Sequence, residues 1–324
     1  MPDVIRWGIL GAGDTATRFA QGLKHVKGAE LTCVWSRRFP AAEAFTSAHG
    51  GVPLTDLALL LDGSVDAVYI ATHPDSHHAY AMAALTARKH VLCEKPSMLN
   101  GMQLDEVLLA ASSHRLVFME AMKTPFFPLY RRLREHLQQD PVGQIGFVRA
   151  GSLLANIPLE HPVYNLKLGG GSLLAIAPYE AFLAVEWLGP VDQLQAIGRF
   201  GETGIDTFAS LQTRHPHGVA QLHCGLGLHG MGDALLAGPR GNIYLPAKWW
   251  NPAQATIRYV DGRTVELDVP FVSTGFQYEA EHFCDLVRTG RCESPIMTHA
   301  MSRQMMRLLD LARGSIGLVY PQER

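Results

Sequence analysis

The sequence has almost no excess of charge of either sign. Among its 324 residues, Lys and Arg together number 28 and Asp and Glu number 30, so the formal net charge is −2. Proteins that hold nucleic acid or an anionic membrane surface by charge carry a basic patch or a basic excess. The composition therefore predicts that neither is a partner.

Cysteine is scarce, and its spacing is not that of a structural site. The five cysteines are Cys33, Cys93, Cys224, Cys284 and Cys292. An odd count without a Cys-x-x-Cys pair argues against a disulfide framework and against a zinc ribbon. Because the first residues also lack the apolar core of a signal peptide, we expect reduced thiols and a cytoplasmic protein.

Long apolar runs are absent as well. The most apolar stretch, Leu173 to Leu188, is interrupted by Pro178, Glu180 and Glu186. It is too short and too polar to cross a bilayer, so no membrane span is predicted. We expect one buried helix here, from Ser172 to Trp187.

The first part of the chain alternates strands and helices. Helices are expected from Asp14, over 41–49, and from Pro74 to Arg88. The expected strands are Arg6–Leu10, Leu31–Ser36, Val65–Ala71, His90–Cys93 and Leu116–Met119. Strands joined by single helices form a parallel sheet. Residues 1–120 are therefore predicted to form an α/β Rossmann domain.

After Pro125 the pattern becomes β-rich, with Gly, Pro, Asn and Asp between the strands. The expected strands are 145–154, 194–200, 207–214, 219–224, 255–260 and 264–269, and helices are expected over 129–137, 277–288 and 299–313. We predict an α+β domain over 121–324 with a mostly antiparallel open sheet, which serves substrate binding and oligomerisation. The last helices could instead pack back on the first domain.

A glycine motif lies between the first expected strand and helix. Gly11-Ala12-Gly13-Asp14-Thr15-Ala16 reads Gly-x-Gly-x-x-Ala. Gly11 permits a tight turn, Gly13 lets the backbone approach a pyrophosphate, and Ala16 allows close packing of helix on strand. With Asp14 and Thr15, they begin a helix whose N-terminus faces the phosphates. Dinucleotide binding is favoured over a purely structural turn.

The end of the second strand indicates which dinucleotide. An acidic residue there would bond the ribose hydroxyls of NAD, but this chain has Ser36-Arg37-Arg38. A hydroxyl and guanidinium groups suit a 2′-phosphate. NADP(H) is therefore favoured over NAD(H), unless the two arginines are simply solvated.

A lysine, Lys95, follows the strand expected at His90–Cys93. Glu94-Lys95-Pro96 ends that strand at the carboxyl edge of the sheet, where open α/β folds bind their ligands. Nearby, His73, His77 and His78 have no Cys or acidic partner in a ligand pattern, so no metal is predicted. Trp249-Trp250 could stack on a sugar, although packing in the core or at a subunit interface is favoured.

Together these segments resemble the Gfo/Idh/MocA oxidoreductase family. The matching segments are Gly11–Ala16, Ile70-Ala-Thr72 with His77, and Glu94-Lys95-Pro96. Its dimeric dihydrodiol dehydrogenase branch is the most similar. That similarity rests on Met119-Glu-Ala, Phe126-Phe-Pro, Leu168-Gly-Gly-Gly-Ser-Leu-Leu with Tyr179, Gly275-Phe-Gln-Tyr-Glu-Ala-Glu-His282 and Glu293-Ser-Pro.

The resemblance implies roles for individual residues. Lys95 would bind the nicotinamide ribose and the substrate oxygen, and Tyr179 would donate or accept the proton. Thr72, His77 and Glu94 would belong to the cofactor side, and Lys95–Pro96 would be a cis bond. A lysine ammonium stabilises the negative charge that develops on oxygen during hydride transfer, and a phenol can deliver a proton.

The chain departs from the family pattern in three places. Ala175 stands where the family usually has Asp, four residues before the proton-transferring residue. Pro178 precedes Tyr179 inside the expected helix, and Lys123 replaces a Trp of the branch. The loss of the carboxylate puts catalytic competence in question, and Lys123 affects substrate choice.

These features predict an NADP(H)-dependent dehydrogenase or reductase acting on CH–OH groups. Its substrate would be a secondary alcohol or carbonyl of a diol, sugar or cyclitol, and a homo-oligomer, with a dimer favoured, is expected. A non-catalytic NADP(H)-binding sensor or scaffold is a second hypothesis, suggested by Ala175. A redox-neutral, cofactor-dependent glycosidase is a third.

Overall fold

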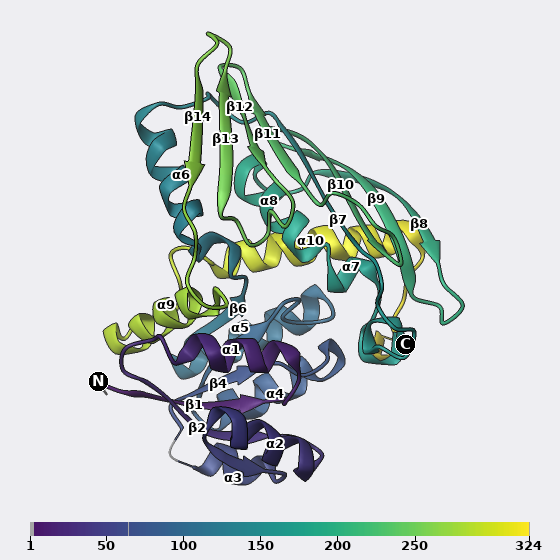
Figure 1. Ribbon diagram of the computed structural model, residues 1–324. Helices are drawn as coiled ribbons and strands as arrows, with labels where there is room; N and C mark the ends of the chain where they lie inside the picture. Colours follow the sequence, from purple (N-terminus) through teal and green to yellow (C-terminus); the bar gives the residue numbers. More distant parts are fainter. Residues whose placement is uncertain (1–2, 64, 324) are drawn as a thin grey trace. The chain divides into compact units, whose positions relative to one another are not determined.

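The computed structural model describes residues 3–63 and 65–323. The chain forms two compact units (Figure 1). The first unit joins residues 1–123 to residues 272–299, and the second joins 124–271 to 300–324. Each unit is built around a β-sheet of its own.

The first unit contains a six-stranded sheet in the order β3-β2-β1-β4-β5-β6. Every neighbouring pair is parallel. Its strands are β1 (Ile5–Leu10), β2 (Ala29–Trp35), β3 (Val52–Leu54), β4 (Ala67–Ile70), β5 (His90–Glu94) and β6 (Phe118–Ala121). Its helices are α1 (Asp14–Leu23), α2 (Phe39–His49), α3 (Leu57–Asp62), α4 (Pro74–Thr86), α5 (Gly101–His114) and α9 (Phe276–Thr289). The predicted Rossmann architecture is confirmed.

Helix α1 illustrates why these residues form these elements. Ala16, Phe19, Ala20 and Leu23 recur at helical spacing, and all four are buried. Helix α4 starts at Pro74, which occupies the first turn, where its missing N–H costs no hydrogen bond.

Helix α9 packs on α1 although it comes from the C-terminal part of the chain. Phe276 of α9 meets Phe19 edge-on with ring centroids 6.5 Å apart, and Phe283 lies 5.1 Å from Trp7. Gly22 permits this approach, because a Cβ there would lie 2.9 Å from the backbone nitrogen of Gln277. One of the C-terminal helices, α9, thus packs against α1 of the Rossmann unit.

The second unit contains an eight-stranded sheet in the order β14-β13-β12-β11-β7-β10-β9-β8. Strands β7 and β10 pair in parallel and the other neighbours are antiparallel. The strands are β7 (Phe147–Leu154), β8 (Gln193–Phe200), β9 (Asp206–His215), β10 (Gly218–Leu226), β11 (Ala234–Gly238), β12 (Gly241–Leu245), β13 (Gln254–Tyr259) and β14 (Thr264–Asp268). The predicted mostly antiparallel sheet is confirmed.

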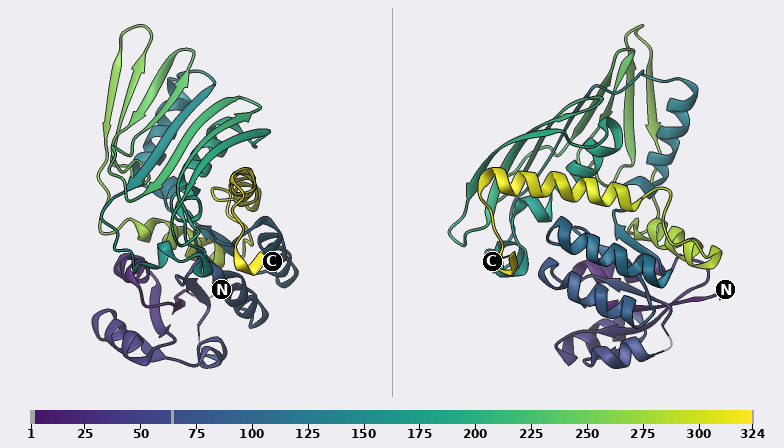
Figure 2. Two further views of the ribbon diagram at one scale, coloured as in Figure 1. Left: turned by 90° about the vertical axis from the view of Figure 1, so that its right-hand side faces the viewer. Right: turned by 180° about the vertical axis from the view of Figure 1, so that it is seen from behind.

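Helices of the second unit cover one face of this sheet, as Figure 2 shows for α6 and α8. The helices are α6 (Pro128–Gln139), α7 (Ser172–Ala175), α8 (Pro178–Leu188) and α10 (His299–Ile316), which begins at the last residue of the first unit. Short 3-10 turns lie at Thr124–Phe126, Pro162–Tyr164, Leu166–Leu168 and Pro321–Glu323. On the edge strand β8, every second residue is exposed.

The expected single helix from Ser172 to Trp187 is wrong. The segment forms α7 and α8, with a break at Ile176–Ala177. Pro178 explains the break, because it has no N–H to donate and its ring clashes with the preceding turn of a continuous helix. It instead occupies the first turn of α8, and hydrogen bonding resumes with the N–H of Ala181 donating to the carbonyl of Ala177 at 2.8 Å.

Within the described residues, no single helix combines the length and the apolar character that a membrane crossing needs. One bent pair, Leu166–Ala175 with Pro178–Leu188, passes by length and composition alone, with an angle of 44° between its halves.

Candidate active site

The sequence motifs of the first unit meet at one edge of its sheet. The glycine motif follows β1, Ser36 follows β2, Thr72 follows β4, and Lys95 follows β5. Because the strands are parallel, all four positions lie at the carboxyl edge, where open α/β sheets bind ligands. Lys123 comes after β6 at the same edge, so the fold places a second lysine there.

The glycine loop has the shape that a phosphate group requires. Gly11 has a φ of +106°, and a Cβ there would lie 2.5 Å from the carbonyl oxygen of Ala71. Gly13 precedes α1, and a Cβ there would meet no atom within 4 Å. Gly11 is thus required by packing against the neighbouring strand end, whereas Gly13 leaves open space before the helix N-terminus.

The Ser36-Arg37-Arg38 segment leads from β2 into α2. Ser36 is half-buried, and its hydroxyl oxygen accepts from the N–H of Arg38 at 3.3 Å. Both arginine side chains are exposed. Asp75 lies near enough to Arg37 for that guanidinium to oppose the rise in the Asp75 pKa that burial causes. The segment therefore presents cationic groups to solvent beside a hydroxyl.

The turn that carries Lys95 is fixed by buried side chains. His77 is 1% exposed, and its ring nitrogens lie 3.0 Å from the carbonyl oxygen of Pro96 and 3.1 Å from that of Thr72. Burial lowers the pKa of His77 to about 4, so the ring is neutral. Glu120 of β6 accepts from the N–H of Ser97 at 2.9 Å. The Lys95–Pro96 bond is cis, as the resemblance implied.

Glu94, the residue before Lys95, is held by a tyrosine of the neighbouring strand β4. Its carboxylate accepts a hydrogen bond from the hydroxyl of Tyr69, which is completely buried in β4. The Tyr69 ring stacks on Phe19 with centroids 3.6 Å apart. Burial, followed by the charges of Glu94 and Glu279, raises the pKa of Tyr69 well above its usual value, so the phenol keeps its proton.

Behind Lys95 lies a buried charged cluster that the sequence did not reveal. Lys123 is 5% exposed, and its ammonium lies 4.6 Å from the ring centroid of Phe276. Burial lowers the pKa of Lys123 to about 8, and the like charges of Arg18 and Lys95 act in the same direction, whereas Glu94 and Glu279 oppose it.

Glu279 of α9 completes this cluster. It is 0% exposed, and within the described part of the chain neither carboxylate oxygen has a hydrogen-bond partner. Burial and the charge of Glu94 raise its pKa well above the usual value, and the charge of Lys123 lowers it. The position of Glu279 depends on α9 returning to the first unit, which no local pattern could indicate.

Tyr179 and Ala175 belong to the second unit. Tyr179 is the second residue of α8, and Ala175 ends α7. From Gly169 to Val185, these two are the residues that are not buried. Although the helix is broken between them, the segment leaves these two positions half-buried while their neighbours are fully buried.

An aromatic ring lies close to Tyr179. Its ring centroid lies 6.2 Å from that of Trp250, which is half-buried, whereas Trp249 is 1% exposed and donates to the carbonyl of Gly151 at 3.3 Å. Glu180 is fully buried and accepts from the hydroxyl of Ser152 at 2.7 Å. Trp249 is therefore a core residue, while Trp250 lies near the half-buried ring of Tyr179.

The three neighbouring histidines do not converge. His77 faces two carbonyl oxygens, whereas the Nε2 of His78 lies 2.8 Å from the carboxylate of Glu106. Across residues 3–63 and 65–323, no group of three or more His, Cys, Asp or Glu side chains is arranged to hold a metal ion.

The chain is similar to known oxidoreductases along nearly its whole length. A family profile described as an oxidoreductase family with an NAD-binding Rossmann fold matches residues 5–122. The trans-1,2-dihydrobenzene-1,2-diol dehydrogenase of Danio rerio is 32% identical over 337 residues, which cover 98% of this chain and 99% of that protein. The scyllo-inositol 2-dehydrogenase (NADP(+)) IolU of Bacillus subtilis is 28% identical, over 99% of this chain and all of that protein.

A solved structure shows the same architecture. KijD10, a 3-ketoreductase from Actinomadura kijaniata in complex with NADP and TDP-benzene, superposes with a TM-score of 0.88 at 25% identity. The match covers 97% of this chain and 98% of that chain. Both sheets of the present chain therefore have counterparts in one enzyme fold.

Proposed function

We propose a specific reaction for this chain, which belongs to the Gfo/Idh/MocA oxidoreductase family and is an NAD(P)-dependent dehydrogenase or reductase. The family resemblance seen in the sequence is thus confirmed. The proposed reaction is NADP(H)-dependent hydride transfer to or from a secondary alcohol or carbonyl of a diol, sugar or cyclitol. The observation that carries it is the turn of Lys95 at the carboxyl edge, where His77 and Glu120 hold the two residues that follow the lysine.

The residues at that edge fit a dinucleotide. Open space beyond Gly13 suits the pyrophosphate, and Gly11, Asp14, Thr15 and Ala16 shape the turn before it. We assign Thr72, His77 and Glu94 to the same side, where the first two hold the backbone near Lys95. The nicotinamide supplies or accepts the hydride when it is bound.

The protein's own groups handle charge and proton. The Lys95 ammonium binds the reacting oxygen and stabilises the negative charge that develops on it. Tyr179 gives a proton to that oxygen in reduction and removes one in oxidation. Its half-buried position, next to the equally half-buried Trp250, supports contact with a small molecule.

The cofactor preference can be tested separately. With Ser36, Arg37 and Arg38 where NAD-specific enzymes carry an acid, NADP(H) should bind at least about tenfold more tightly than NAD(H), or about 1.4 kcal/mol. Arg37→Asp should reverse the order, whereas Arg131→Asp on α6 should not change it. Equal dissociation constants for the two cofactors by calorimetry would contradict the assignment.

The reaction itself calls for a panel of diols, polyols and cyclitols with both cofactors. A net change in nicotinamide absorbance supports the proposal. Ala175, half-buried four residues before Tyr179 and without a carboxylate, favours a sensor as second candidate. Tight cofactor binding without turnover on any substrate would support that candidate, and product formation without net cofactor change would indicate redox-neutral glycosidase chemistry.

We also propose a cytoplasmic homodimer. The exposed alternate residues of β8, among them Ile197 at 78% exposure, support a sheet face that takes a second subunit. Light scattering of the purified protein would test this, because a monomeric mass at micromolar concentration contradicts it.

A further inference from the structure

The segment that presents Tyr179 starts from a tightly confined glycine loop. Gly170 and Gly171 donate their N–H groups to the carbonyls of Asn165 at 3.0 Å and Val163 at 2.8 Å. A Cβ on Gly170 would lie 2.4 Å from the Val163 oxygen. Gly171 has a φ of +117°, and a Cβ there would lie 2.1 Å from Asp206. The loop therefore has one backbone path, and it enters α7 directly.

Asp206, at the start of β9, holds the far end of this loop. Its Oδ2 accepts from the hydroxyl of Ser172 at 2.6 Å and from the N–H of Leu173 at 2.7 Å. Ser172 in turn accepts from the thiol of Cys224 at 3.2 Å. Asp206 is 0% exposed. The first turn of α7 is thus bonded to the sheet through one buried carboxylate.

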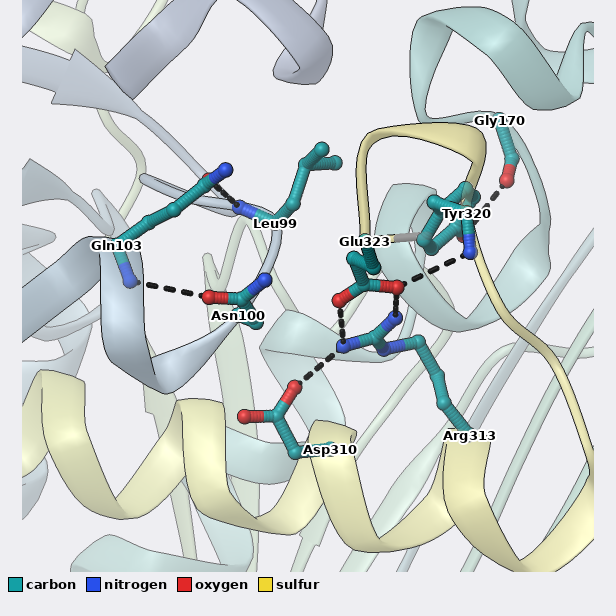
Figure 3. Close-up of polar contacts among 8 residues, drawn as sticks. All are labelled: Leu99, Asn100, Gln103, Gly170, Asp310, Arg313, Tyr320 and Glu323. Carbon is teal, nitrogen blue, oxygen red and sulfur yellow. Dashed lines mark hydrogen bonds and ion pairs between the residues drawn. The ribbon is translucent and has the colours of Figure 1, made fainter.

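A second anchor comes from residues 320–323, which we term the Tyr320 segment. The hydroxyl of Tyr320 donates to the carbonyl of Gly170 at 2.8 Å, and the ring is completely buried (Figure 3). Gln322 donates from its side-chain amide to the carbonyl of Lys167 at 2.6 Å. Residues far apart in the sequence therefore hold both turns before α7.

Arg313 of α10 fixes the Tyr320 segment in turn. Its guanidinium donates to both carboxylate oxygens of Glu323, at 2.8 and 3.0 Å, and to Asp310 at 2.6 Å. Glu323 also accepts from the N–H of Tyr320 at 3.0 Å (Figure 3). Such a paired guanidinium–carboxylate contact is strong and directional. It orients the Tyr320 hydroxyl toward the glycine loop.

We propose that Tyr320 is a positioning residue for Tyr179, acting through Gly170 and the backbone of α7. The inference rests on the proposed function of Tyr179. Within 169–185 the two half-buried positions, 175 and 179, come soon after the loop that Tyr320 and Asp206 hold. A small shift of this backbone moves the Tyr179 hydroxyl, and misplacement of a reacting group lowers its effectiveness.

The test compares Tyr320→Phe with Tyr259→Phe. Each variant loses a phenol hydrogen bond to a backbone carbonyl, since Tyr259 donates to Asp140 at 2.7 Å elsewhere in the same unit. Tyr259→Phe also loses a 3.0 Å contact with the Nε2 of His136, which makes it the more demanding control. In Tyr320→Phe, amide hydrogen exchange over 166–177 should quicken about fivefold, the scale of one hydrogen bond. The kcat on the true substrate should fall about fivefold, with the KM for NADP(H) unchanged. Tyr259→Phe should change neither quantity.

The exchange measurement does not depend on any reaction, so the positioning role of Tyr320 and the proton role of Tyr179 can be disproved separately. Unchanged exchange over 166–177 in Tyr320→Phe, or equal losses of kcat in both variants, would overturn the positioning role. Tyr179→Phe with full turnover would instead remove the proton role of Tyr179, whatever the exchange shows. Glu323→Gln, which weakens the contact with Arg313, should give the same pattern as Tyr320→Phe to a smaller degree.

Discussion

Lys95 and Tyr179, the two proposed catalytic groups, are supported by different physics. Lys95 follows a strand of a parallel sheet, directly after the half-buried Glu94, and the charges of buried Lys123 and Glu279 interact with this region. Tyr179 begins a helix after a glycine loop that is held by hydrogen bonds to its backbone. The surroundings of Lys95 are thus defined by charged side chains, and those of Tyr179 by hydrogen bonds that fix the backbone.

The difference predicts different sensitivities. In a poorly solvated interior each charge affects the protonation of its neighbours, so the surroundings of Lys95 should respond to pH and to charge substitution. Hydrogen bonds between a side chain and the backbone are local and directional, so the surroundings of Tyr179 should respond to geometry. Three substitutions examine this contrast, beginning with the largest effect.

Removing the charge of Lys95 should have the greatest consequence. Lys95→Met should lower kcat about a hundredfold or more, the scale of losing one electrostatic donor to a developing charge. The dissociation constant for NADP(H) should change far less. Lys27→Met, which removes an exposed lysine of the same unit, serves as the control. Near-normal kcat in Lys95→Met would refute the assigned role.

The pH dependence of the free energy of unfolding reports on the charged surroundings of Lys123. Its pKa is lowered from 10.5 to about 8, so between these values the unfolded chain holds a proton that the folded chain lacks. The free energy of unfolding should therefore gain a contribution that rises with pH in this window, by up to about 1.4 kcal/mol per pH unit.

Lys123→Met should abolish that contribution, and Lys89→Met should retain it. Urea unfolding at a series of pH values from about 7.5 to 10 measures how the free energy of unfolding of each variant depends on pH. Parallel pH dependence in wild type and Lys123→Met would show that the ammonium is not perturbed by burial.

Introducing a charge beside Tyr179 should have the smallest effect. Ala175→Asp places a carboxylate at a half-buried position, where the family usually has one and where α7 ends. We expect turnover of polyols to rise about fivefold, part of the hundredfold that orientation can contribute. Val260→Asp, which adds a carboxylate at a residue that is 79% exposed elsewhere in the second unit, is the control. A fall in kcat with intact folding would show that the break at Pro178 directs position 175 away from the substrate.

Local patterns were sufficient for most of the fold. Helix α1 and strand β1 combine a clear period with a glycine boundary, and both were predicted within two residues. Strands β3, β11 and β12 and helices α3 and α5 were not predicted. Strand β3 has three residues, and β11 and β12 meet at a Gly-Pro-Arg-Gly turn, so too few residues remained to reveal a period.

The site divides in the same way. The glycine loop and Lys95 follow strands directly, so sequence order alone puts them at one edge of a parallel sheet. The burial of Lys123 depends on α9, and the role of Asp206 depends on the pairing of distant strands. A lysine after a strand is ordinarily solvated. These positions could be found only once the tertiary contacts were known.

The first unit is discontinuous in sequence, and this has a consequence for how the protein is made. A ribosome releases the six strands of the Rossmann sheet long before it releases α9, which covers Phe19 and Trp7. Until then the nascent domain carries an uncovered aromatic surface, a state that invites aggregation or chaperone binding. The second unit must be synthesised within that interval, so the nucleotide-binding half of the molecule is the first to begin folding and among the last to finish.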